Sequence, residues 1–251
     1  MLKDERLHQI IHLVNENKMM RTDEIAQVIG ASLATVRRDL NALDEAGRVK
    51  KIFGGVKSVA PADYITTEEE MGTKIQRHMR EKIAMAQLAA TFVQDHDFVY
   101  MDAGTSVEAM IGFIQAKGLT FVTNSLTTAK ELSAMKQRVY TLPGEIKLAT
   151  DSIIGISAAE YLRRFNFTVG FFGANGVHKE RGFTTPDLNE AMVKSAALEQ
   201  CRTAYILADQ SKFGRVSQVT FCRDQAICVI RDCRGPEGNL SAEVVRLEEL
   251  V

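Results

Sequence analysis

Residues 22–40 read TDEIAQVIGASLATVRRDL, and residues 47–55 read GRVKKIFGG. The first stretch predicts two short helices around a tight turn, because Thr22 suits the N-cap of one helix, Gly30 its end and Ser32 the N-cap of the next. The second stretch predicts a basic hairpin, with glycines where the turn or its exit needs a positive φ. This order of elements is typical of a winged helix-turn-helix.

One helix precedes this motif. Residues 3–17 carry apolar side chains at helical spacing. His8 and His12 are four residues apart, as in a pair of metal ligands, but no third ligand is nearby, which favours a surface or packing role.

The helix that follows Ser32, expected to run to Gly47, presents two different faces. At about 100° per residue, Val36, Leu40 and Leu43 share one side, which must face a core. The other side is small and polar, with groups that hydrogen-bond base edges in a major groove. Consecutive arginines are also common as plain surface charges, so the motif as a whole carries the prediction of DNA binding. The expected base contacts, with Ala34 allowing close approach, are Thr35, Arg38 and Asn41. The other expected DNA contacts, mainly to phosphates, are Thr22, Ser32, Arg37, Arg48, Lys50 and Lys51.

Composition agrees with a protein that touches DNA through one end only. The chain has 251 residues, of which 45% are hydrophobic and 25% charged, and its net charge is −1. Residues 31–59 nevertheless hold six basic and three acidic side chains, a local excess of three positive charges. No secretory signal, membrane-spanning stretch or zinc-type cysteine spacing is present, so we expect a cytoplasmic protein without metal or cofactor.

The rest of the chain predicts an α/β domain. We expect a DNA-binding domain over residues 1–57, a linker over 58–72 and an effector domain over 73–251 that opens with a long helix over about 73–94. Short apolar runs then alternate with helical segments, which favours an open, mostly parallel sheet with helices on both faces. The expected strands are 98–101, 119–122, 139–142, 168–172, 204–208 and 226–230.

Two loops in this domain are typical of anion binding. Asp102-Ala-Gly-Thr-Ser106 follows one expected strand and opens a helix, so hydroxyls and free helix N–H groups lie together. Thr123-Asn-Ser125 repeats the arrangement after the next strand. Asp102 suits sugar hydroxyls, and Lys212 could supply a cation. Each loop alone is a weak signal, because a strand–Gly–Thr/Ser–helix turn is more often ordinary turn chemistry.

The motif over Ser32–Gly55 resembles the DNA-binding signature of the DeoR family of bacterial sugar-metabolism repressors. The resemblance continues through Asp102-Ala-Gly-Thr-Ser106, Val122-Thr-Asn-Ser125, Leu142-Pro-Gly144, Gly173-Ala-Asn-Gly176 and Leu207-Ala-Asp-Gln-Ser-Lys-Phe-Gly214, and so covers nearly the whole chain. It implies an effector domain similar in fold to ribose-5-phosphate isomerase and CoA transferases, with phosphorylated sugars as inducers. The contacts it implies are Asp102, Gly104, Thr105, Ser106, Thr123, Asn124, Ser125, Asn175 and Lys212.

Two positions stand apart from that ligand set. Glu145 occupies a place where the family commonly has glycine, and a carboxylate there would repel phosphate, so its loop is left out. Glu190 and Lys194, four apart in a segment similar to that of fructose-type repressors, are interpreted as a surface ion pair.

The resemblance implies a repressor that binds a double-stranded DNA operator as a homo-oligomer (dimer or tetramer), with no membrane partner, and that a phosphorylated sugar releases. Fructose 1-phosphate and a tagatose or galactose phosphate are both open. The alternative is a sugar-phosphate isomerase-like enzyme with an appended DNA-binding domain. The isomerases of this fold carry an acidic cluster where residues 173–177 lack a carboxylate, so no catalytic residue is assigned.

Overall fold

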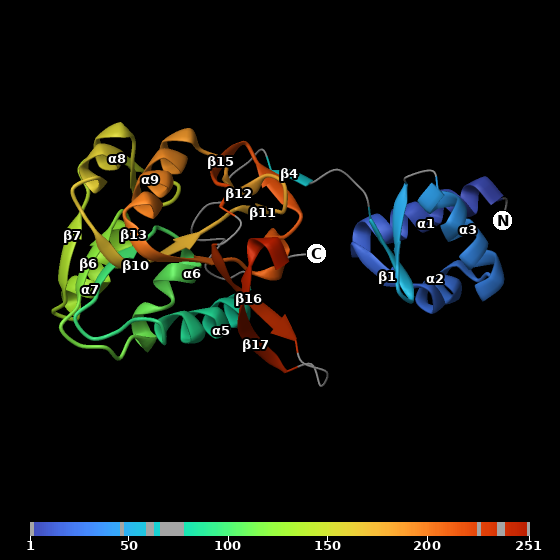
Figure 1. Cartoon of the computed structure of the whole chain (residues 1–251), viewed down its shortest axis with the longest axis horizontal. Helices are drawn as coiled ribbons and strands as arrows, with labels where there is room; N and C mark the ends of the chain where they lie inside the picture. Colours follow the sequence, from blue (N-terminus) through green and yellow to red (C-terminus); the bar gives the residue numbers. More distant parts are fainter. Residues whose placement is uncertain are drawn as a thin grey trace. The chain divides into compact units, whose positions relative to one another are not determined.

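The chain divides into two compact units, Met1–Asp63 and Tyr64–Val251 (Figure 1). The structure is a computed structural model. It describes residues 3–45, 48–58, 63–65, 78–224, 227–234 and 239–249.

The first unit packs helices against a small antiparallel sheet. Its helices are α1 (Lys3–Asn17), α2 (Thr22–Ile29) and α3 (Leu33–Glu45), and its strands are β1 (Met19–Arg21), β2 (Val49–Ile52) and β3 (Gly55–Ser58), in the order β1-β3-β2. The predicted helices and hairpin are confirmed, whereas β1 was not expected. Ile10, Ile25, Val36 and Val56 are fully buried together, so all three helices share one core with the sheet.

The helix starts are capped in two different ways. Ser32 caps α3 as expected, because its Oγ accepts a bond of 3.2 Å from the backbone N of Thr35. The expectation of Thr22 as N-cap is wrong: the N-cap of α2 is Arg21, and Thr22 is the first helical residue. The backbone N of Thr22 instead donates to the carbonyl of Gly54 at 3.2 Å, which ties α2 to the hairpin turn. The expected end of α3 at Gly47 lies outside the described residues.

The second unit is built on a seven-stranded sheet in the order β17-β16-β13-β10-β5-β6-β7. Every neighbouring pair is parallel except β16 with β17. The strands are β5 (Phe98–Met101), β6 (Thr120–Thr123), β7 (Arg138–Thr141), β10 (Phe167–Gly173), β13 (Cys201–Leu207), β16 (Cys228–Arg234) and β17 (Leu240–Arg246). All six predicted strands are confirmed, although the last begins at Cys228, and β17 adds an antiparallel edge.

Helices cover both faces of this sheet (Figure 1). One face carries α5 (Met79–Ala90), α6 (Thr105–Glu108) and α7 (Leu126–Ala134), and the other carries α8 (Ile156–Leu162) and α9 (Leu188–Glu199). Alternation along β5 explains the two cores, since Tyr100 packs on one side and Val99 and Met101 on the other. The long helix expected over 73–94 is described from Met79 and ends early, at Ala90; residues 73–77 lie outside the described part.

Smaller strands complete the second unit. A three-stranded sheet joins β11 (Gly176–His178), β12 (Gly182–Thr185) and β15 (Val219–Cys222); β8 (Glu145–Lys147) pairs with β9 (Ser152–Ile154), and β4 (Asp63–Ile65) with β14 (Arg215–Ser217). Three 3-10 turns are η1 (Ile111–Phe113), η2 (Gln210–Lys212) and η3 (Leu247–Glu249). Part of the segment expected as a linker over 58–72 therefore forms a strand. None of the described helices has the length and apolar character needed to cross a membrane.

Candidate functional site

The outer face of α3 is exposed within the first unit. Ala34, Arg37, Arg38 and Asn41 are exposed and Thr35 is half-buried, while the core-facing positions are buried as expected. The buried carboxylate of Asp39 accepts a bond of 2.6 Å from Arg6 Nε, and this hydrogen bond raises the pKa of Arg6 against the opposing effect of desolvation. The ion pair fixes α3 against α1, so the exposed face projects from a rigid support.

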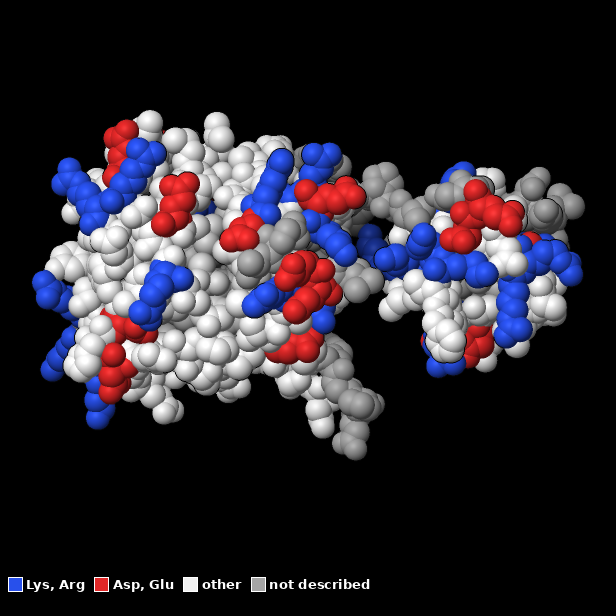
Figure 2. Space-filling view, in the orientation of Figure 1, with Lys and Arg blue, Asp and Glu red and all other residues white. Residues whose placement is uncertain are grey.

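The hairpin β2–β3 continues this face. A groove between α3 and the hairpin is lined by residues of both, among them Arg37, Asn41, Lys51, Ile52 and Gly54. Lys51 Nζ donates to Asn41 Oδ1 at 2.6 Å. On the face shown in Figure 2, Lys and Arg side chains form a band across the first unit. The helix and hairpin thus share one groove that holds Arg37 and Lys51, with Asp23 of α2 as its acidic member.

A pocket in the second unit lies where the strand order of the large sheet reverses. The chain leaves β5 toward β6 and leaves β10 toward β13, so the loops after β5 and β10 diverge from neighbouring strand ends. Open α/β sheets bind ligands at such switch points. The lining residues are His78, Lys82, Ala103, Gly104, Thr105, Ser106, Thr150, Gly173, Ala174, Asn175, Glu190, Lys194, Leu207, Ala208, Asp209 and Lys212.

The pocket brings together only part of the predicted ligand set. Gly104, Thr105, Ser106, Asn175 and Lys212 line it, from the loops after three neighbouring strands. At Gly104, which precedes α6, an added Cβ would meet no protein atom within 4 Å, so a side chain there would enter the open space of the pocket. Glu145 is exposed and lies outside the lining, as expected.

The loop Thr123–Ser125 has a structural role instead of lining the pocket. Asn124 Oδ1 accepts bonds from the backbone N of Ala103 at 2.8 Å and from the hydroxyl of Tyr100 at 3.2 Å. Ser125 Oγ caps α7 by accepting from the backbone N of Thr128, and Thr123 Oγ1 accepts from the backbone N of Ser125. These side chains are buried because β6 lies one strand away from the reversal. Asn124 thus supports the loop after β5, Ser125 and Thr123 order the start of α7, and none of the three lines the pocket.

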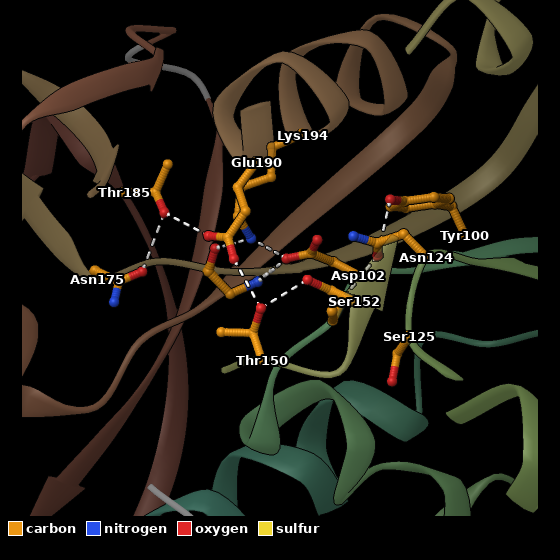
Figure 3. Close-up of polar contacts among 12 residues, drawn as sticks. Tyr100, Asp102, Asn124, Ser125, Thr150, Ser152, Asn175, Thr185, Glu190 and Lys194 are labelled. Atoms are coloured by element: carbon orange, nitrogen blue, oxygen red, sulfur yellow. Dashed lines mark hydrogen bonds and ion pairs between the residues drawn. The ribbon is translucent and has the colours of Figure 1, made fainter. Parts of the chain in front are cut away.

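Asp102 does not line the pocket either. Its carboxylate is fully buried below the pocket and pairs with Lys194 Nζ, and its Oδ2 accepts a bond of 3.0 Å from the backbone N of Gly173 (Figure 3). Lys194 Nζ also donates to the carbonyl of Gly173 at 3.1 Å. Burial raises the pKa of Asp102, and Lys194 opposes that rise. The pair joins the ends of β5 and β10 through α9.

Glu190 has a similar buried network. Its Oε1 accepts from Lys147 Nζ at 3.1 Å and from Thr150 Oγ1 at 3.0 Å, and its Oε2 accepts from Thr185 Oγ1 at 3.0 Å. Thr185 Oγ1 also reaches Asn175 Oδ1 at 3.3 Å (Figure 3). The interpretation of Glu190 and Lys194 as a surface ion pair is wrong: both are buried and each has its own partners.

Sequence reasoning named Lys212 but missed three other residues of the pocket wall. His78, Lys82 and Lys194 line it, and both lysines are buried. A signal existed for Lys194, since it lies in EAMVKSAALE, a helical stretch with apolar or small residues on every side. For Lys82 we find no comparable signal. Among the described residues, no three His, Cys, Asp or Glu side chains gather as a metal site would require.

Comparison with known proteins gives matches over both units. Residues 6–62 match the family described as "DeoR-like helix-turn-helix domain", and residues 77–232 match the one described as "DeoR C terminal sensor domain". The chain is 36% identical to the HTH-type transcriptional regulator FruR of Bacillus subtilis, over 88% of this chain and 87% of that protein. It is 33% identical to a lactose phosphotransferase system repressor of Staphylococcus aureus, over 94% and 95% of the two chains.

Solved structures give a weaker likeness. Ribose 5-phosphate isomerase A of Methanocaldococcus jannaschii aligns with a TM-score of 0.41 and 11% identity, over 68% of this chain and 82% of that one. A likeness at that level decides nothing about this chain.

Proposed function

The chain belongs to the DeoR family of transcriptional regulators, and from that premise we propose that it represses a sugar-utilisation operon until a phosphorylated sugar binds its second unit. It is a DNA-binding regulator and not an enzyme. We assign DNA binding to residues 1–57 and ligand sensing to residues 73–251, with residues 58–72 connecting the two.

The observation that carries the sensing proposal is that lysines, backbone N–H groups and uncharged polar side chains meet in one pocket, where the strand order of the large sheet reverses. Lys82, Lys194 and Lys212 surround a space that also meets the first residues of α6. The backbone N–H groups of Thr105 and Ser106 precede the first intrahelical bonds and are suited to phosphate oxygens. The amide of Asn175 and the hydroxyls of Thr105, Ser106 and Thr150 can hydrogen-bond the hydroxyl groups of a sugar. A phosphorylated sugar combines these two chemistries in one molecule.

The site residues proposed for this ligand follow from the lining. We retain Gly104, Thr105, Ser106, Asn175 and Lys212, and add Lys82 as a cation; Lys194 also lines the pocket, but its Nζ pairs with Asp102 and donates to the carbonyl of Gly173. Glu190 and Asp102 hold the pocket walls, because their carboxylates are already engaged by Lys147, Thr150, Thr185 and Lys194.

Release requires that the sugar bind the DNA-competent and DNA-free states with different affinities. We propose that the protein acts as a homo-oligomer on repeated half-sites, since one small reading module seldom gives useful specificity.

Release by a sugar phosphate is tested by a mobility-shift titration on an operator duplex selected from a random library, with fructose 1-phosphate, galactose 6-phosphate and tagatose phosphates added in turn. One of them should weaken binding. If none does while the duplex still binds, the proposed relief is wrong but DNA binding stands.

Lys212→Met tests the sensing half alone. The variant is expected to need about tenfold more phosphorylated sugar for release, because a charge-assisted bond to phosphate is worth about 1.5 kcal/mol. Operator affinity without the sugar should stay at the wild-type value. Lys130→Met, on the exposed side of α7 and outside the pocket, is the matched control. An equal response of both variants would remove Lys212 from the site.

A further inference from the structure

The tip of the hairpin in the first unit exposes a large aromatic side chain. Phe53 has a relative exposure of 108%, and the adjoining Ile52 is also exposed. Covering an exposed phenyl ring is favourable by about 1.5–3 kcal/mol, so a partner that buries it gains affinity. Among the described residues of this unit, no other large apolar side chain is as exposed.

The turn that carries Phe53 is held firmly. Ile52 pairs with Gly55 across a two-residue loop, and Gly54 has a φ of +77°, as the third residue of a type II turn requires. The carbonyl of Gly54 accepts the backbone N–H of Thr22, at the start of α2. At Gly55 an added Cβ would lie 2.5 Å from the carbonyl oxygen of Met20, so glycine allows β1 to pack against the hairpin. The ring is therefore presented on a supported tip.

The surroundings of Phe53 identify the chemistry of its partner. The strands behind it carry Lys50, Lys51 and Lys57, with Arg48 preceding them. Ile52 and Gly54, which flank Phe53 in the sequence, line the same groove as Arg37 and Asn41 of α3, so a duplex in that groove would lie close to the tip. Basic strands behind an apolar ring fit a polyanion that offers apolar surface between its charges. The minor groove of DNA does so, because its deoxyribose walls and base steps lie between two rows of phosphates.

We propose that Phe53 inserts into the minor groove next to the major-groove segment read by α3, while the lysines behind it contact the bordering phosphates. This inference rests on the proposed DNA-binding function. It adds Phe53 as an uncharged residue that responds to the shape of the groove. Apolar side chains that enter a minor groove respond to its width and to how easily the base steps open. Phe53 thus makes affinity depend on base pairs outside the segment that α3 contacts.

The test compares Phe53→Ala with Lys50→Ala on the duplex selected by the wild-type protein, as a function of salt. Phe53→Ala is expected to weaken binding about tenfold at every salt concentration. The slope of log K against log salt should stay unchanged, because no phosphate contact is lost. Lys50→Ala should reduce that slope by about 0.9. Phe53→Leu, which keeps an apolar side chain, should recover part of the affinity.

Hydroxyl-radical footprinting supplies the second readout, since the radical attacks deoxyribose from the minor groove. Wild-type protein should protect a short stretch beside the α3 site, and Phe53→Ala should lose that protection alone. Wild-type affinity and footprint in Phe53→Ala would overturn the proposal. The proposal would also be overturned if Phe53→Ala differed from the wild-type protein in oligomeric state by sedimentation, because the ring would then contact a second copy of the chain. If wild-type protein bound no duplex at all, the DNA-binding function itself would fail, and the two failures are distinguishable.

Discussion

Lys194→Met is expected to lower the free energy of unfolding of the second unit by about 3–5 kcal/mol, because it leaves the buried carboxylate of Asp102 without its cation. Methionine keeps most of the side-chain volume, so the loss reports charge and not a cavity. Among the described residues, Asp102 Oδ1 has no hydrogen-bond partner, so only Gly173 N would remain to stabilise the charge. Urea unfolding followed by circular dichroism measures the change.

Two companion variants separate this effect from general damage. Lys130→Met removes an exposed lysine on α7 and should unfold within about 0.5 kcal/mol of wild type. The double variant Asp102→Asn/Lys194→Met removes both charges and should recover part of the loss. A Lys194→Met protein as stable as wild type would mean that the carboxylate is not charged in the folded state.

The same variant carries a pH signature. Burial raises the pKa of Asp102, and Lys194 is the main opposing influence, so its removal raises that pKa further. An acid whose folded-state pKa is raised contributes its stability below the unfolded pKa of about 3.9 and loses it as pH rises through the folded value. The deficit of Lys194→Met relative to wild type should therefore grow from acid to neutral pH. Asp102→Asn in the same background should remove the trend.

The first unit was largely predictable because its signals are local. Caps, a glycine turn and apolar spacing place α2, α3 and the hairpin from neighbours in the sequence alone. Strand β1 was not predictable, because three residues, Met19–Arg21, are too few to show an alternating apolar pattern. They form a strand only by pairing with β3. Thr22 was assigned as a cap since its residue type suits one, yet its amide is engaged by the hairpin turn.

The pocket was predictable only in outline. Strand ends and their polar loops could be placed by alternation, but which loops face the ligand depends on strand order, which is a non-local property. The order places β10 beside β5, so the loop Gly173–Asn175 joins the site, while Asn124 after β6 bonds the backbone of the loop after β5. Charged residues at helical spacing suggest a surface. Lys194 contradicts that reading because its partner Asp102 lies 92 residues earlier in the chain.

Arg38→Ala is expected to weaken binding to the selected operator by about 1–3 kcal/mol and to relax the base preference at one position, if its guanidinium reads a guanine edge. Competition binding against duplexes with single base-pair changes measures both effects. Binding to an unrelated duplex should fall far less, because the variant keeps the other basic groups of the surface.

The adjacent Arg37 is the matched comparison. It lines the groove between α3 and the hairpin, where the duplex backbone would run, whereas Arg38 does not line that groove. Arg37→Ala should therefore weaken all duplexes to a similar degree and reduce the salt slope by about 0.9, without changing base preference. Both variants should fold normally, since the pair of Arg6 with Asp39 keeps α3 in place. If Arg37→Ala altered the base preference and Arg38→Ala did not, α3 would lie in the groove rotated about its axis, with Arg37 on the bases.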